Sequence, residues 1–177
     1  TGVCSLQKMS KLPKRKNTRL KEFDYSQSSY YFVTICLKDR KEFFSHILNT
    51  DLILTEYGKI LDEVWRSLPK YYKVELDYYV IMPDHFHGIL ILDNTLTFKN
   101  DKEDKLFSLS EIIGKFKSFS TRKIREILAK GEKFEWQKSF YDRIIRNESE
   151  LYNIRKYIKE NPLRWDLEKN NPENLEM

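Results

Sequence analysis

The sequence predicts a single α+β domain, built as a ferredoxin-like antiparallel sheet with helices packed on one side of it. The chain has 177 residues, which is enough for one domain with a full core and too few for two comfortable ones. Its apolar content of 40% and aromatic content of 14% argue against disorder. The expected elements follow the order strand, helix, hairpin, helix, strand, helix, which is close to the split βαβ plan.

The first expected elements are a strand and a helix. Residues 29–37 are dense in aromatic and β-branched side chains, which predicts a buried strand. From about residue 54 to residue 68 apolar side chains recur at steps of three and four, which predicts an amphipathic helix that ends at Pro69. One face of this helix is therefore expected to pack on the sheet.

A hairpin and a loop follow. Residues 74–82 and 86–92 predict two strands, and Pro83-Asp84 between them is typical of a tight turn. Residues 94–105 are polar and charged, which predicts a loop.

The last third of the chain predicts two helices with a short strand between them. Ser108 and Glu111 have capping-box spacing, and apolar residues at helical period follow them. Residues 136–145 are expected to contain a short strand. Asn147 then caps a final helix, which Pro162 is expected to end.

The positive charge is concentrated at the N-terminus. The formal net charge is +5, and residues 1–20 contain six basic residues and no acid. We therefore expect residues 1–20 to form a flexible basic arm and residues 21–177 to form one domain. Such an arm attracts polyanions, nucleic acid before anionic membrane, although a merely solvated terminus explains the same charges.

Cysteine use and hydropathy indicate the compartment. Cys4 and Cys36 are the two cysteines, and their positions argue against a disulfide framework. No segment approaches 18 apolar residues, and no apolar stretch typical of a secretion signal follows the basic residues. These features predict a cytoplasmic protein with no membrane partner.

Two of the three histidines lie one residue apart in the second strand of the hairpin. Successive strand side chains point to opposite faces, so His85 and His87 share one face and Phe86 points the other way. Two imidazoles on one face can bind a divalent ion if a third ligand comes from elsewhere. Ordinary polar residues on the wet face of a sheet would give the same pattern, and both explanations stay open.

The final helix offers further ligands. Tyr157 and Asn161 are four residues apart and therefore share one helix face. An amide oxygen suits a hard divalent ion, and a phenol beside that ion is a potential nucleophile at phosphorus. Alternatively, Tyr157 packs inward and Asn161 is a helix-end residue before a proline.

Three spaced motifs resemble the single-tyrosine HUH transposases, in particular the REP-associated tyrosine transposases and related small insertion-sequence transposases. The motifs are residues 80–90, Trp136-Gln137 with residues 140–146, and residues 157–162, and the resemblance covers about residues 19–165. It implies a ferredoxin-like domain of the HUH nuclease type that cuts and rejoins single-stranded DNA near hairpin-forming repeats. It also implies a prokaryotic, nucleoid-associated protein.

The resemblance implies a role for each candidate residue. His85, His87 and Asn161 map onto the metal ligands, and Tyr157 maps onto the nucleophile that forms a 5′-phosphotyrosine. Asp84, next to His85, is a weaker candidate that would orient this histidine without binding the metal itself. The implied metal is Mg²⁺ or Mn²⁺, whereas two histidines by themselves would equally permit Zn²⁺.

Basic residues are candidate DNA contacts, although a solvated surface explains those on the helix equally well. They are Lys14, Arg15, Lys16, Arg19, Lys115, Arg122, Arg143 and Arg146. A homodimer is possible. Two alternative functions remain: a catalytically silent, domesticated DNA-binding protein of the same fold, and a replication-initiator or relaxase-type nickase. A histidine-triad hydrolase is disfavoured because position 89 is Ile.

Overall fold

The computed structural model describes residues 28–48, 51–93 and 106–169. The predicted basic arm, with Lys14, Arg15, Lys16 and Arg19, lies outside these described residues. The predicted loop at 94–105 lies outside them as well.

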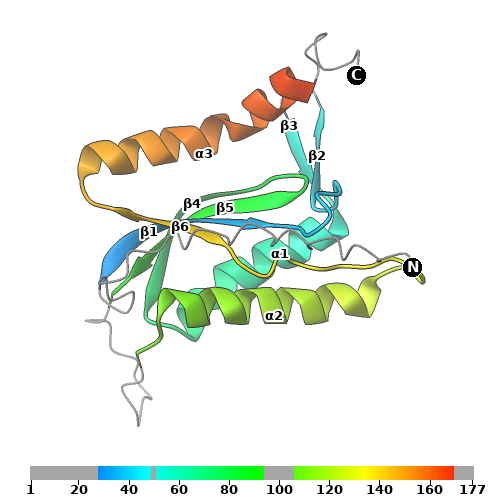
Figure 1. Cartoon of the computed structure of the whole chain (residues 1–177), viewed down its shortest axis with the longest axis horizontal. Coiled ribbons are helices and arrows are strands. Elements are labelled where there is room, and N and C mark those ends of the chain that lie inside the picture. The colour runs from blue at the N-terminus through cyan, green and yellow to red at the C-terminus, as the bar shows by residue number, and fades with distance from the viewer. Residues whose placement is uncertain (1–27, 49–50, 94–105, 170–177) are drawn as a thin grey trace, which may run out of the picture.

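A four-stranded sheet forms the centre of the molecule, with the strand order β4-β5-β1-β6 and antiparallel pairing between all neighbours. Two helices, α1 and α2, lie on one face of this sheet (Figure 1). The arrangement confirms the ferredoxin-like prediction. The elements are β1 Ser29–Cys36, α1 Glu56–Ser67, β4 Val74–Ile81, β5 His85–Leu92, α2 Leu109–Ile127 and β6 Tyr141–Ile145.

The main core lies between the sheet and these two helices. Phe86 is fully buried there, and the centroid of its ring lies 4.5 Å from that of Trp65 and 5.5 Å from that of Phe116. A Cβ atom at Gly88 would lie 2.8 Å from Trp65, so the glycine lets the indole pack against the strand. The prediction that Phe86 points away from the face that carries the histidines is confirmed.

Both helices of this layer begin at a side-chain cap. Thr55 accepts a hydrogen bond from the backbone of Gly58 and so begins α1 slightly later than the sequence predicted. Ser108 and Glu111 form the predicted capping box of α2. A short 3₁₀ helix at Leu68–Lys70 follows α1.

The third helix, α3 Glu148–Lys169, covers the opposite face of the sheet (Figure 1). The expectation that all helices lie on one side is therefore wrong for α3. β5 is buried on both faces, and a second, smaller apolar cluster forms between α3 and the sheet. Its buried members are Ile89, Ile145, Leu151, Ile154 and Ile158.

The final helix also continues through Pro162, where the sequence predicted its end. Proline lacks an N–H and removes one helical hydrogen bond, which is costly when nothing compensates. Here the turn beyond the proline makes a tertiary contact, because the ring of Trp165 lies 5.8 Å from that of His85. Residues 161–165 therefore lie over the sheet face that carries the histidines.

A second hairpin was not predicted. Strands β2 Ser45–Leu48 and β3 Asp51–Leu54 form a separate two-stranded sheet, and they lie between β1 and α1 in the sequence. Each strand has four residues, which is too short for a clear alternation of apolar and polar side chains. Within the described part of the chain, no helix is long and apolar enough to cross a membrane.

Candidate active site

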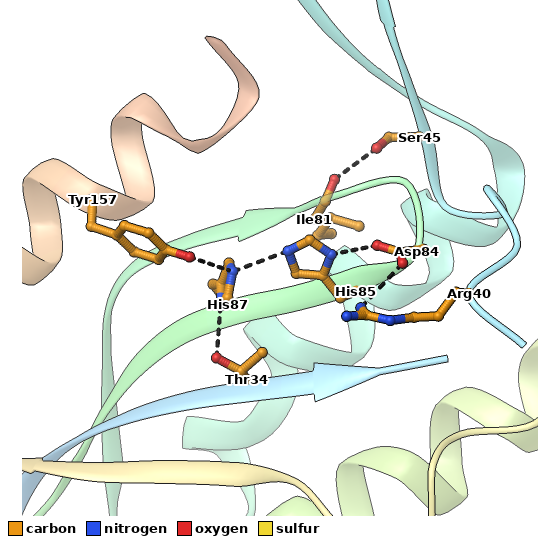
Figure 2. A network of polar contacts seen from close by, with 8 residues as sticks. All are labelled: Thr34, Arg40, Ser45, Ile81, Asp84, His85, His87 and Tyr157. Atoms are coloured by element: carbon orange, nitrogen blue, oxygen red, sulfur yellow. Dashed lines mark hydrogen bonds and ion pairs between the residues drawn. The ribbon is translucent and has the colours of Figure 1, made fainter. Parts of the chain in front are cut away.

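The two histidines lie on the face of β5 that α3 covers. Both residues are buried, with relative exposures of 8% for His85 and 5% for His87. The wet-surface explanation is therefore wrong. The two Nε2 atoms lie 3.0 Å apart and point toward each other (Figure 2).

The other ring nitrogen of each histidine has its own partner (Figure 2). Nδ1 of His85 lies 2.5 Å from Oδ1 of Asp84, and Nδ1 of His87 lies 2.8 Å from Oγ1 of Thr34. A carboxylate oxygen accepts hydrogen bonds, so Nδ1 of His85 carries the ring hydrogen and donates a hydrogen bond to Asp84. The Thr34 hydroxyl can accept from His87 in the same way. Both Nε2 atoms then keep their lone pairs for a ligand.

Burial changes the protonation of His87. Desolvation, with a smaller contribution from the neighbouring His85, lowers the pKa of His87 to about 3. His87 is therefore neutral at physiological pH. A neutral imidazole is the form that binds metal ions.

The final helix brings Tyr157 and Asn161 to the same place. The Tyr157 hydroxyl lies 3.5 Å from Nε2 of His87, and the side chain is 37% exposed. Asn161, one turn later, is 7% exposed and lines the same cavity. The structure thus gathers the four residues singled out from the sequence at one point.

These side chains line a cavity of about 340 Å³. Several of its lining residues were missed by sequence reasoning, because they come from segments with no motif of their own. The missed residues are Thr34, Cys36, Arg40, Tyr141, Arg164 and Trp165. Strand pairing could have identified two of them, since Thr34 and Cys36 lie opposite His87 and His85 on β1.

An ion pair at the sheet edge holds α3 over the site. Arg155 of α3 donates from Nε and Nη2 to Oδ2 of Asp77 on β4, at 3.0 and 2.6 Å. The guanidinium also lies over the ring of Tyr78, 5.5 Å from its centroid. The Asp77 side chain is 9% exposed, so this is a shielded contact.

The predicted DNA-contacting residues are dispersed. Lys115 and Arg122 line a different groove of about 940 Å³, formed by α1 and α2 on the far face of the sheet. Arg143 and Arg146 lie near the start of α3, where Arg143 is paired with Glu150. The structure therefore brings none of these four basic residues into the cavity with the histidines.

A family model described as "Transposase IS200 like" matches residues 25–161. The chain belongs to the IS200-like transposase family. It is therefore a transposase, and its family cleaves and rejoins DNA.

Two relatives of this transposase come from Haemophilus influenzae. An uncharacterised protein is 31% identical over 165 residues, which cover 86% of this chain and 90% of the relative. A second is 25% identical over 145 residues, covering 80% of this chain and 74% of the relative, and its name provisionally assigns it to the REP-associated tyrosine transposases.

The solved structure of a REP-associated tyrosine transposase bound to a REP hairpin has a similar fold. The TM-score is 0.56 at 21% identity, over 82% of this transposase and 73% of that chain. At this identity the similarity establishes the fold, which agrees with the sheet and helices described above.

Proposed function

We propose that this transposase is a metal-dependent single-stranded DNA endonuclease and strand transferase that acts through a 5′-phosphotyrosine intermediate. The observation that carries the proposal is the convergence of two imidazole Nε2 atoms and one phenol hydroxyl in a single cavity. His87 Nε2 lies 3.0 Å from His85 Nε2 and 3.5 Å from the Tyr157 hydroxyl.

The spacing of the two Nε2 atoms suits one metal ion. Two ligands at about 2.1 Å from an ion, at a right angle to each other, are about 3.0 Å apart. The observed separation is 3.0 Å. Among the described residues no group of three or more His, Cys, Asp or Glu side chains is arranged to hold a metal, so the third protein ligand would be the amide of Asn161.

His85, His87 and Asn161 would hold Mg²⁺ or Mn²⁺, and Asp84 would keep His85 in the tautomer that ligates. A bound divalent ion would polarise a non-bridging oxygen of the scissile phosphate and help the phenol to ionise. The three ligands are uncharged, so the ion would keep its full positive charge for this task.

The Tyr157 oxygen would attack the phosphorus in line with the leaving 3′ oxygen. A bond forms between the phenol oxygen and phosphorus, and the bond between phosphorus and the 3′ oxygen breaks. The 3′ oxygen takes the electron pair and a proton and leaves as a free 3′-OH. Because the phosphodiester is exchanged for a phosphotyrosine ester, rejoining requires no ATP.

The substrate we propose is a single strand that carries a hairpin or repeat end. This part of the proposal rests on the family and on the hairpin named for the structurally similar transposase. The cavity supports it in one respect, since Tyr141 is 53% exposed on its rim and offers a surface on which an unpaired base can stack.

The test is covalent capture of labelled DNA. A 3′-labelled single strand bearing a hairpin is incubated with the protein in Mg²⁺ or Mn²⁺ and resolved by denaturing electrophoresis, because a 5′-phosphotyrosine retains the fragment downstream of the cut. We expect a protein–DNA adduct with the wild type, no adduct after chelation with EDTA, and none with Tyr157→Phe. Tyr152→Phe is a matched control, because Tyr152 is an exposed tyrosine on the same helix.

Undiminished adduct with Tyr157→Phe, in a variant that folds, would show that another group is the nucleophile. Hairpin binding without any adduct in either metal would instead favour the catalytically silent DNA-binding protein.

A further inference from the structure

The cavity contains a positive charge that the motifs did not reveal. Its described lining residues include two arginines, Arg40 and Arg164, and no aspartate or glutamate. Asp84, the carboxylate that contacts His85, is buried behind that histidine, with a side-chain exposure of 6%. A cavity lined in this way attracts an anionic group.

Arg40 has an unusual backbone. Among the residues that the structure describes, it is the one non-glycine residue with a positive φ, at 54°. This left-handed conformation is unfavourable for a residue with a Cβ atom, and such strain persists where the surrounding structure enforces it. The fold therefore holds Arg40 in a conformation that its own backbone disfavours.

The Pro83-Asp84 turn supplies contacts on both sides of Arg40, beside those that residues 132–137 and Thr55 make with the same segment. On one side of Arg40, the backbone N–H of Leu37 donates to the carbonyl of Asp84 at 3.0 Å. On the other side, the N–H groups of Phe43 and Phe44 donate to the carbonyl of Pro83 at 2.7 and 3.0 Å. The loop that carries Arg40 is thus fixed at both ends to the turn that precedes His85.

The Arg40 side chain is fixed by the same turn. Its Nη1 lies 3.1 Å from Oδ2 of Asp84, while Oδ1 of that carboxylate binds His85 (Figure 2). One carboxylate therefore sets the position of a histidine and of an arginine together. A guanidinium has five N–H donors, and 56% of the Arg40 side chain remains exposed at the cavity.

We infer that Arg40 is a further catalytic residue, which binds a non-bridging oxygen of the scissile phosphate. This inference rests on the proposed function. Arginine is suited to this contact because its planar fork matches two phosphate oxygens, and a donor fixed in advance stabilises the charge that develops during in-line transfer. Asp84 holds the guanidinium in place, so no reorganisation is needed when the DNA binds.

Arg164 is the other candidate and is less well suited. It lies on α3, where its guanidinium is 5.8 Å from the centroid of the Tyr157 ring and 3.2 Å from a Glu160 oxygen. That neighbouring carboxylate opposes the binding of an anion. Arg40 also pairs with a carboxylate, but Asp84 is buried behind His85 and its other oxygen accepts a hydrogen bond from that histidine.

The experiment compares single-turnover rates of adduct formation on the labelled hairpin strand. We expect Arg40→Gly to slow the reaction about 100-fold and Arg40→Lys to recover part of the loss. Lys41→Ala is the matched control, since Lys41 is the next residue and pairs with Glu132, away from the cavity. We expect its rate to equal that of the wild type.

Stability and metal affinity separate a catalytic role from a structural one. Glycine adopts positive φ freely, which offsets the lost ion pair with Asp84, so we expect Arg40→Gly to stay folded and to unfold at a temperature close to that of the wild type. Mn²⁺ affinity, measured by titration calorimetry, should not change, because Arg40 is not a ligand. An equal loss of rate and of Mn²⁺ affinity would overturn the inference, because Arg40 would then act through His85.

A modified substrate tests the phosphate contact itself. Replacing the scissile linkage by a methylphosphonate removes one charged oxygen, so the rate ratio between wild type and Arg40→Gly should fall toward one. An unchanged ratio would exclude the contact.

Failure of this inference is distinguishable from failure of the proposed function. If the wild type forms an adduct that Tyr157→Phe abolishes, and Arg40→Gly reacts within about threefold of the wild type, the inference about Arg40 alone is wrong. If the wild type forms no adduct, the proposed function is wrong.

Discussion

His87 is enclosed on several sides by neighbouring side chains. Thr34 holds Nδ1, the ring of Phe32 stacks against it with centroids 5.4 Å apart, and Tyr157 approaches its other edge with ring centroids 5.4 Å apart. These contacts fix the ring orientation and exclude water. Because they bury the ring, they also disfavour the charged imidazolium form of His87.

The depressed pKa of His87 predicts a specific pH dependence of stability. The unfolded chain takes up this proton near pH 6.5, whereas the folded chain does so near pH 3. The free energy of unfolding should therefore fall by up to about 1.4 kcal/mol per pH unit as the pH decreases below 6.5, with no contribution from His87 above that value.

Urea denaturation in EDTA between pH 7.5 and pH 5 measures this effect, with His87→Gln as the comparison. The stability difference between wild type and variant should change in favour of the variant as the pH falls. A difference that stays constant over this range would show that His87 titrates normally in the folded chain.

At the scale of the elements, α3 carries Tyr157 and packs on the sheet through the smaller of the two apolar clusters. Leu151, Ile154 and Ile158 of α3 pack there against Ile89 and Ile145 of the sheet, and the ion pair between Arg155 and Asp77 adds a contact with β4. The larger core lies on the other face of the sheet. We therefore expect α3 to separate from the sheet more readily than α1 or α2.

Arg155→Met should loosen α3 without unfolding the domain. It leaves the shielded Asp77 carboxylate without its main partner, which we expect to cost about 1–3 kcal/mol. Hydrogen exchange measured by mass spectrometry should show lower protection in α3 and unchanged protection in β5.

Lys156→Met is the control, because this adjacent residue makes one longer exposed contact, 3.8 Å to Glu160. Equal exchange in both variants would mean that the ion pair does not hold α3.

Local patterns predicted the parts of the site that depend on local geometry. The alternation along β5 placed His85 and His87 opposite Phe86, and the helical period placed Tyr157 one turn from Asn161. Apolar periodicity alone could not predict which face of the sheet α3 covers. The helix has few buried apolar residues, and both faces of β5 are apolar enough to pack against them. Arg40 carries no local signal at all, since its role follows from contacts with the distant Pro83-Asp84 turn.

At the scale of the whole molecule, one chain supplies every residue of the proposed site. Tyr157 lies beside His87 of its own chain, with the hydroxyl 3.5 Å from Nε2. The homodimer considered from the sequence stays a prediction, and the geometry of the site does not require it.

A mixing experiment tests whether the site works within one chain. Tyr157→Phe lacks the proposed nucleophile, and His87→Gln lacks a proposed ligand but keeps Tyr157. We expect no adduct when the two variants are mixed, because neither chain contains a complete site. Adduct on the His87→Gln chain, identified by a size tag, would show that two chains exchange α3.

The side chains of β5 alternate between the two faces of the sheet, and this has a consequence for how the protein can evolve. One side of the strand supports the main core through Phe86, and the other side holds His87 in a separate layer with α3. Substitutions on the α3 side can therefore remove the proposed catalytic residues while the core side keeps the sheet folded. A lineage can pass from a transposase to a stable DNA-binding protein by changing one or two side chains, without passing through an unfolded intermediate.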